Sequence, residues 1–304
     1  MVLNLRAIAG TLCVLLFFLG IALLFPFLIG LIYNEPSAWS FAITSALAMV
    51  IGGGGWRITG GSGNDLQIRD GFAIVALTWW VLSLVGALPF VLGGVLDSYT
   101  DAFFETMSGF TTTGATILGG STTPEIEMLP NAFLFWRSLM HWLGGMGIIV
   151  LTLAILPILG IGGMQLFKAE VPGPSADKLT PRIQETARRL WLIYVGFTVI
   201  QTGLLWPAMG LFDAVNHAFA TMATGGFSTE NGSVGQYNAP YVEWVITIFM
   251  VLAGINFALH FRLLSGKAAA FWKDTELKVY LGILLAAAVL ITFANWGGEG
   301  GYAG

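Results

Sequence analysis

Seven stretches of the sequence are apolar over lengths close to that of a membrane span, and they restrict the fold more than any other feature. A helix that crosses the hydrocarbon core of a bilayer needs about 20 apolar residues. The stretches lie at Ile8–Tyr33, Trp39–Gly53, Gly71–Val95, Asn131–Ile161, Leu190–Leu211, Tyr241–Phe261 and Val279–Trp296. Charged residues make up only 10% of the chain, against roughly 25% in soluble domains. The sequence therefore predicts an all-α, multi-pass protein of the lipid bilayer.

The basic residues gather on one side of the membrane if the N-terminus is cytoplasmic and all seven stretches span. Of the 13 lysines and arginines, all but Arg137 then share the side of the N-terminus. The positive-inside rule assigns that side to the cytoplasm. The opposite side collects acidic residues, namely Glu35, Asp97, Asp101, Glu105, Glu125, Glu127, Asp213, Glu230 and Glu299. These acids either raise the local cation concentration or are ordinary surface residues.

Two polar segments between apolar stretches resemble each other. The segment Asp101–Gly120 is expected to form a short helix to about Gly109 and then extended backbone rich in glycine and threonine. The segment Asp213–Ser228 aligns with it without a gap and places Gly226 over Gly114. Non-helical backbone is tolerated at membrane depth only where it is buried in protein or lines a watery cavity. The pair predicts a pore built from repeated re-entrant elements.

The non-helical parts of these segments offer oxygen ligands for a monovalent cation. Backbone carbonyls can replace the hydration shell of the ion, and glycine permits the backbone angles that turn successive carbonyls inward. Threonine hydroxyls can add ligands, and the negative end of the preceding helix dipole favours a cation. The candidate selectivity-filter residues are Thr111, Thr112, Thr113, Gly114, Ala223, Thr224, Gly225 and Gly226.

The order of these features predicts five parts in the chain. Each pore repeat consists of an outer helix, a re-entrant element and an inner helix. The parts are two N-terminal transmembrane helices (1–56), pore repeat 1 (71–161), a cytoplasmic linker (162–189), pore repeat 2 (190–262) and the first helix of an incomplete repeat 3 (276–304). The linker is expected to begin a helix after Pro181.

Other polar residues receive structural interpretations. Arg137 lies within an apolar stretch, and it is expected to hold the first re-entrant helix with Glu105 as its partner. A role in binding the ion is not expected, because a fixed positive charge would repel a cation. The glycine run Gly52–Gly55 is expected to belong to a flexible inner loop, because no GxxxxGK[ST] motif follows it. The single cysteine, Cys13, excludes an intrachain disulfide. The sequence offers no catalytic constellation, so we expect neither an enzyme nor a cofactor, and no nucleic-acid partner.

Four motifs together resemble the TrkH subunits of bacterial Trk potassium uptake systems. They are Ser108-Gly-Phe-Thr-Thr-Thr-Gly-Ala-Thr116, Phe135-Trp-Arg-Ser-Leu-Met-His-Trp-Leu-Gly-Gly-Met-Gly147, Ala169-Glu-Val-Pro-Gly-Pro174 with Lys178-Leu-Thr-Pro-Arg-Ile183, and Ala223-Thr-Gly-Gly-Phe-Ser228. The resemblance implies four helix–loop–helix repeats around one pore in the bacterial inner membrane. It also implies K⁺ as the transported ion, a homodimer, and a cytoplasmic TrkA-type nucleotide-binding regulatory subunit. The eight candidate filter residues fall on the filter positions of repeats one and two.

The length departs from the pattern of that family. The third and fourth filters of the family have no counterpart before Gly304, so the chain is expected to be a fragment, truncated after the start of the third repeat. The main interpretation is a pore-forming subunit that moves K⁺ passively or coupled to another gradient. The alternatives are a secondary transporter of another small solute, built on broken helices, and a non-conducting fragment that lacks half the pore.

Overall fold

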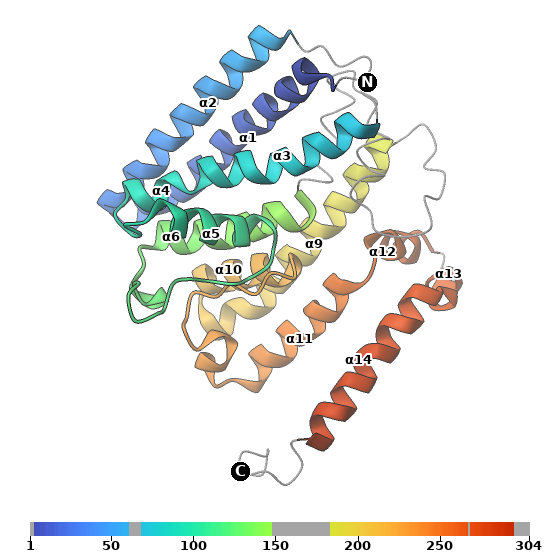
Figure 1. The fold of residues 1–304 in the computed structure, drawn as a ribbon. Helices are drawn as coiled ribbons and strands as arrows, with labels where there is room; N and C mark the ends of the chain where they lie inside the picture. Colours follow the sequence, from blue (N-terminus) through green and yellow to red (C-terminus); the bar gives the residue numbers. More distant parts are fainter. Residues whose placement is uncertain (1–2, 61–67, 148–182, 267, 295–304) are drawn as a thin grey trace. The chain divides into compact units, whose positions relative to one another are not determined.

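The structure, a computed structural model, describes residues 3–60, 68–147, 183–266 and 268–294. Within these ranges the regular structure is helical (Figure 1), as the sequence predicts. The chain divides into two compact units, Met1–Met250 and Val251–Gly304, and each is described by itself.

Among the described residues, five long helical segments are apolar enough to span a membrane. They are built from α1 (Leu5–Ile32), α2 (Trp39–Thr59) with the short turn η1 (Pro36–Ala38), α3 (Ile68–Gly86) with α4 (Leu88–Leu92), α9 (Ile183–Met209) and α14 (Thr275–Ala294). The expected span Asn131–Ile161 is described only in its first half. There α6 (Asn131–Trp142) leads into the π-helical turn η3 (Leu143–Gly147), and residues 148–161 lie outside the described ranges.

The expected span Tyr241–Phe261 is broken, so the prediction of one continuous helix is wrong here. The helix α11 (Pro240–Gly254) ends, and α12 (Phe257–Leu264) begins at an angle of 96° to it. The side chain of Asn256 accepts a hydrogen bond from the amide of Ala258 (3.0 Å) and so caps the new helix. Capping of this kind satisfies an amide that would otherwise lack a partner at a helix start, which stabilises the break.

Helices α1 and α2 lie side by side (Figure 1) because small residues let their backbones approach. The hydroxyl of Ser45 donates to the carbonyl of Gly20 (2.6 Å). A side chain at Gly52 would come within 2.6 Å of the Cys13 carbonyl oxygen. The loop predicted for Gly52–Gly55 is therefore wrong: these glycines continue α2 to Thr59. Gly52 and Gly55 must be small, because a Cβ atom at either position would overlap Cys13 on α1.

Two segments of similar order follow. The first contains α3, α4, α5 (Tyr99–Phe110), the turn η2 (Ile126–Met128) and α6. The second contains α9, α10 (Leu211–Met222), the turn η4 (Ser233–Tyr237), α11 and α12, and it is followed by α13 (Ala268–Lys273) and α14. Of the linker predicted at 162–189, residues 162–182 lie outside the described ranges, and its last residues form the start of α9.

Aromatic packing and one carboxylate hold α6 in the first unit. Trp136 is fully buried, and its indole N–H donates to the carbonyl of Gly86 at the end of α3 (3.1 Å). Glu35, in the connection between α1 and α2, accepts bonds from the backbone amides of Asn131 (2.6 Å) and Ala132 (3.0 Å). The N-terminal helices are thus attached directly to the start of α6.

Candidate ion-conduction site

The two helices predicted to be re-entrant, α5 and α10, occupy corresponding positions in the sequence. Both α5 and α10 have 12 residues. Their first residues, Tyr99 and Leu211, differ by 112 positions, as do their last residues, Phe110 and Met222. The same offset of 112 is the one at which the sequence aligns the two segments.

The chain leaves both helices through the same backbone hydrogen bonds. In the first copy the amide of Thr112 donates to Gly109 O (3.2 Å) and that of Thr113 to Ser108 O (3.0 Å). The corresponding bonds of the second copy are Thr224 to Thr221 (2.9 Å) and Gly225 to Ala220 (2.9 Å). The two loops therefore begin with the same geometry, although their sequences differ at half of the filter positions.

The backbone angles alternate in hand along both loops. The angle φ is +54° at Thr112 and +75° at Gly114, and it is +55° at Thr224 and +94° at Gly226. A non-glycine residue in this left-handed region is uncommon, and such backbone costs about 1–3 kcal/mol and clusters at functional sites. The sequence predicts backbone freedom at the glycines, but it carries no signal for the left-handed threonines, because threonine has no intrinsic preference for that region.

The structure brings the two candidate filter loops together. A Cβ atom at Gly114 would overlap the carbonyl oxygen of Gly225. Gly114 is therefore a glycine for two reasons, its positive φ and the backbone that lies against it. At Gly226 only the positive φ requires glycine, because no other atom lies within 4 Å of a built Cβ.

The first loop carries hydroxyls that the second lacks. The hydroxyl of Thr111 donates to Met107 O (2.7 Å) and lies 2.8 Å from the hydroxyl of Thr113. Because the proton of Thr111 is already used, the Thr113 hydroxyl is the donor in the second contact. The remaining lone pairs of both exposed hydroxyls can face a cation. The corresponding residues Ala223 and Gly225 have no side-chain oxygen.

A buried ion pair lies behind the first loop. Arg137 and Glu105 have side chains that are 1% and 0% exposed, and Arg137 Nε lies 2.8 Å from Glu105 Oε1. Glu105 also accepts bonds from the hydroxyl of Thr116 (2.9 Å) and the amide of Ile117 (3.1 Å). The carboxylate of the re-entrant helix thereby fixes the chain that leaves the first loop.

Arg137 extends this network to the second loop. Its Nη1 donates to the carbonyl of Ser228 (3.0 Å), and its Nη2 donates to the hydroxyl of Thr116 (3.2 Å). The guanidinium also lies 4.3 Å from the ring centre of Phe227, within the range of a cation–π contact. One side chain on α6 thus joins the segments that follow both loops.

The second copy replaces the carboxylate by an imidazole. His217 lies 112 positions after Glu105, and Ser228 lies 112 positions after Thr116. His217 Nδ1 lies 2.9 Å from the carbonyl oxygen of Asp213, so it carries the proton, because a carbonyl can only accept. In the neutral ring, Nε2 then accepts from the Ser228 hydroxyl at 3.1 Å. Each re-entrant helix therefore holds the hydroxyl that follows its own loop.

Further residues lie behind the loops, and no part in the filter is predicted for them from the sequence. The ring of His141 stacks on Phe227 (4.1 Å between centroids), and a Cβ at Gly225 would overlap that ring. A Cβ at Gly144 would overlap the carbonyl oxygen of Phe110, and one at Gly145 would lie 2.7 Å from the Cα of Ala223. The signal was the sequence Gly144-Gly-Met-Gly147 close after His141, which marks a close approach of backbones.

The segments that follow the two loops are also joined. The amide of Asn231 donates to Glu127 Oε1 (3.1 Å), and its side-chain oxygen accepts from the amide of Ile126 (3.2 Å). Burial raises the pKa of Glu230, and the nearby carboxylates of Glu127 and Asp213 raise this pKa further. Among the described residues, no group of three His, Cys, Asp or Glu side chains could hold a metal ion, so the acidic residues here do not form such a cluster.

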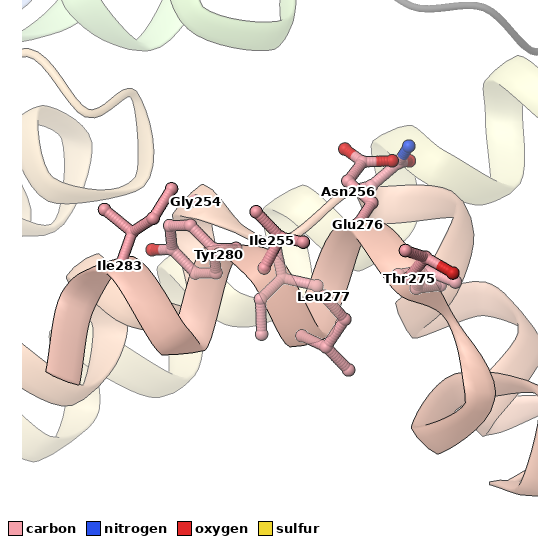
Figure 2. A pocket seen from close by; sticks show the side chains of 10 residues that line it. Gly254, Ile255, Asn256, Thr275, Glu276, Leu277, Tyr280 and Ile283 are labelled. Carbon is pink, nitrogen blue, oxygen red and sulfur yellow. The ribbon is translucent and has the colours of Figure 1, made fainter. Parts of the chain in front are cut away.

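The break between α11 and α12 has its own hydrogen bonds. The hydroxyl of Tyr280 on α14 donates to Val251 O (3.3 Å), and His260 Nε2 donates to Leu252 O (2.9 Å). These two bonds satisfy carbonyls near the end of α11. A cavity of about 430 Å³ lies at the break (Figure 2), lined by Gly254, Ile255, Asn256, Leu259, Thr275, Glu276, Leu277, Val279, Tyr280 and Ile283.

Comparison with known proteins agrees with this geometry. The family model TrkH, described as cation transport protein, matches residues 37–295. The Trk system potassium uptake protein TrkH of Escherichia coli K12 is 45% identical over 295 residues, which cover 96% of this chain and 60% of the relative. The protein TrkG of the same strain is 40% identical over 91% of this chain and 57% of the relative.

A solved structure has the same fold. The crystal structure of the potassium transporter TrkH from Vibrio parahaemolyticus superimposes with a TM-score of 0.81 and 37% identity, over 96% of this chain and 59% of that one. The chain thus spans about three fifths of the length of the relatives that it matches. On the family match and the identity over nearly its whole length, this chain belongs to the TrkH family of cation transport proteins.

Proposed function

We propose that the chain is part of a membrane subunit for potassium uptake and that it supplies two loops of a backbone-carbonyl selectivity filter. The observation that carries the proposal is the matched left-handed backbone at Thr112 and Gly114 and at Thr224 and Gly226. Backbone of alternating hand turns successive carbonyls to one side, where they can replace water around a cation. The names of the relatives, potassium uptake proteins, support K⁺ as the ion.

Each part of the chain has a role in this proposal. Residues 71–161 and 190–262 form two pore repeats, 1–56 is an N-terminal helix pair, 162–189 is a cytoplasmic linker, and 276–304 begins a third repeat. The C-terminal ends of α5 and α10 lead into the loops, so the negative ends of their dipoles favour a cation. The ligands are the eight residues Thr111–Gly114 and Ala223–Gly226.

Arg137 and Glu105 act as structural support in this scheme. Their charges cancel at 2.8 Å, so the arginine does not present an unpaired positive charge to the pore. Its bonds to Thr116 and Ser228 fix the spacing between the two loops. We assign them no contact with the ion.

The charge distribution sets the proposed orientation. The N-terminus and the basic loops face the cytoplasm of a bacterial cell, and the filter loops open to the outer side of the inner membrane. A homodimer and a cytoplasmic TrkA-type nucleotide-binding subunit complete the assembly that the family resemblance implies.

Two glycines allow a test of the filter. We would join the chain to the portion of the Escherichia coli relative that it does not cover and express the chimera in cells without potassium uptake. Gly226→Ala adds a methyl group where space is open, so only the strained φ of +94° opposes it. Gly203→Ala on α9 is the matched control, since its surroundings are equally open and it is helical.

The expected result is loss of growth at low K⁺ and of K⁺ over Na⁺ preference in Gly226→Ala and in Gly114→Ala, with normal growth in Gly203→Ala. All variants must reach the membrane in equal amounts, as measured by immunoblot. Unchanged uptake and selectivity in both filter variants would refute the assignment of the loops.

A further inference from the structure

A groove between α1 and α2 lies outside the proposed ion path. It encloses about 720 Å³ and is lined by Val14, Phe17, Phe18, Met49, Val50, Gly52, Gly53, Gly54, Trp56 and Arg57. This volume lies within the range of small-molecule sites, about 300–1,000 Å³.

The floor of the groove exists because α2 lacks side chains there. A Cβ at Gly54 would have no atom within 4 Å, and one at Gly53 would reach only the ring of Phe17 at 3.6 Å. Gly53 and Gly54 are therefore not required for the packing of α1 in the way that Gly52 is. They leave open space in the groove, which Phe17 and Trp56 also line.

The groove carries one charge, at one end. Arg57 is the single charged side chain of the lining, in the last turn of α2. Within the part of the chain that the structure describes, it has neither an ion pair nor a hydrogen bond. Arg6, at the start of α1, donates to the carbonyl of Thr59 (2.9 Å), which places a second positive charge at the same end of the helix pair. This is the end proposed above to face the cytoplasm.

The length of the groove fits one leaflet. From Met49 to Arg57 the helix rises about 12 Å, close to half of the roughly 30 Å hydrocarbon core. A transmembrane helix of a second copy would extend along the full thickness. An acyl chain that enters from the cytoplasmic leaflet covers only this half, and its headgroup then lies at the level of Arg57.

We propose that this groove binds one phospholipid with an anionic headgroup. The phosphate lies against Arg57, the acyl chain lies over Gly53 and Gly54, and Trp56 marks the membrane surface, where its amphipathic ring is favoured. Basic pockets between transmembrane helices on the cytoplasmic side are suited to anionic headgroups. The site depends on the proposed orientation only for the choice of leaflet.

Native mass spectrometry of the detergent-purified chain tests the proposal. The probes are phosphatidylglycerol and phosphatidylethanolamine with the same acyl chains, titrated separately. We expect one retained phosphatidylglycerol per chain and weaker binding of phosphatidylethanolamine. Arg57→Gln should weaken the binding of phosphatidylglycerol about fivefold, the factor for one basic residue near an anionic surface. Gly54→Leu, which fills the groove, should weaken the binding of both lipids.

Lys278→Gln is the control, because it removes an exposed positive charge that does not line the groove. It should bind both lipids as the wild type does. Equal affinity of the wild type for the two lipids, or undiminished binding of phosphatidylglycerol by Arg57→Gln, would overturn the proposal. If the wild type forms dimers, and Gly54→Leu dissociates them without changing lipid binding, this face is instead an interface between two copies.

Discussion

Removal of Arg137 should destabilise the protein more than the loss of any single exposed charge. Arg137 makes three hydrogen bonds, to Glu105, Ser228 and Thr116, and both members of its ion pair are at most 1% exposed. Breaking a buried pair by removing one partner costs about 3–5 kcal/mol, because an uncompensated charge stays buried. Arg137→Met should therefore lower the free energy of unfolding by about 4 kcal/mol, which is close to a thousandfold in the folding equilibrium.

A double-mutant cycle separates the ion pair from the rest of the network. Glu105→Met should cost a similar amount, because it leaves the guanidinium unpaired. The double variant removes both charges, so its loss should be smaller than the sum of the two single losses by more than about 2 kcal/mol. The assay is denaturant unfolding of the detergent-purified protein, followed by tryptophan fluorescence.

Exposed Lys273→Gln serves as the reference and should lie within about 0.5 kcal/mol of the wild type. If the two single losses simply added in the double variant, the ion pair would not be the source of the stabilisation. An Arg137→Met variant as stable as Lys273→Gln would also contradict a structural role for Arg137. The buried arginine could then belong to the ion path.

Three further predictions concern contacts around the loops. Gly225→Ala should lower the melting temperature of the purified protein, because its Cβ would overlap the His141 ring. Adding His141→Ala should restore part of that loss, and a further drop would contradict the contact. Glu35→Ala should reduce the protection of the first turn of α6 in hydrogen exchange, since two backbone amides there lose their acceptor; unchanged protection would contradict this. The folded state raises the pKa of Glu230 and so favours its protonated form. The resulting stability is present below the unfolded pKa and is lost as the pH rises through the folded pKa. Glu230→Gln should therefore flatten the fall in melting temperature between acidic and neutral pH, and an unchanged slope would exclude Glu230 as its source.

The membrane helices could be predicted from the sequence because their signal is local. A run such as Leu5–Ile32 is apolar on all sides, and no tertiary contact is needed to identify it. The two re-entrant segments were found for a different reason, which is repetition. A single TTTG string is weak, but the alignment at an offset of 112 gave the bounds of both helices to within two residues.

The glycine run in α2 shows what the sequence could not give. Glycine at Gly52–Gly55 lowers intrinsic helix stability by up to about 1 kcal/mol per residue, so nothing within the run itself indicates that α2 continues through it. The contact of Gly52 with the Cys13 backbone shows why it does, and this contact depends on a helix that lies about 40 residues earlier in the sequence. The break at Asn256 could not be predicted for the same reason, because the bonds that His260 and Tyr280 donate to carbonyls of α11 depend on the folded arrangement of the helices.

The difference between the two repeats gives a last prediction. Glu105 and His217 occupy equivalent positions, but Arg137 already uses its Nε, Nη1 and Nη2 for Glu105, Ser228 and Thr116. A carboxylate at position 217, which is 3% exposed, would face the Asp213 carbonyl oxygen without an arginine of its own. His217→Glu should therefore lower the free energy of unfolding by about 3 kcal/mol or more.

The neutral variant His217→Gln keeps hydrogen-bonding groups near Ser228 and should cost only about 1 kcal/mol. Denaturant unfolding of both variants measures the difference. Equal stability of the two would mean that Arg137 can serve two carboxylates, and the use of an imidazole in the second repeat would then need another cause. A larger loss in His217→Glu would show that one buried cation limits the network to one carboxylate, so that the repeats must differ behind loops whose backbones are alike.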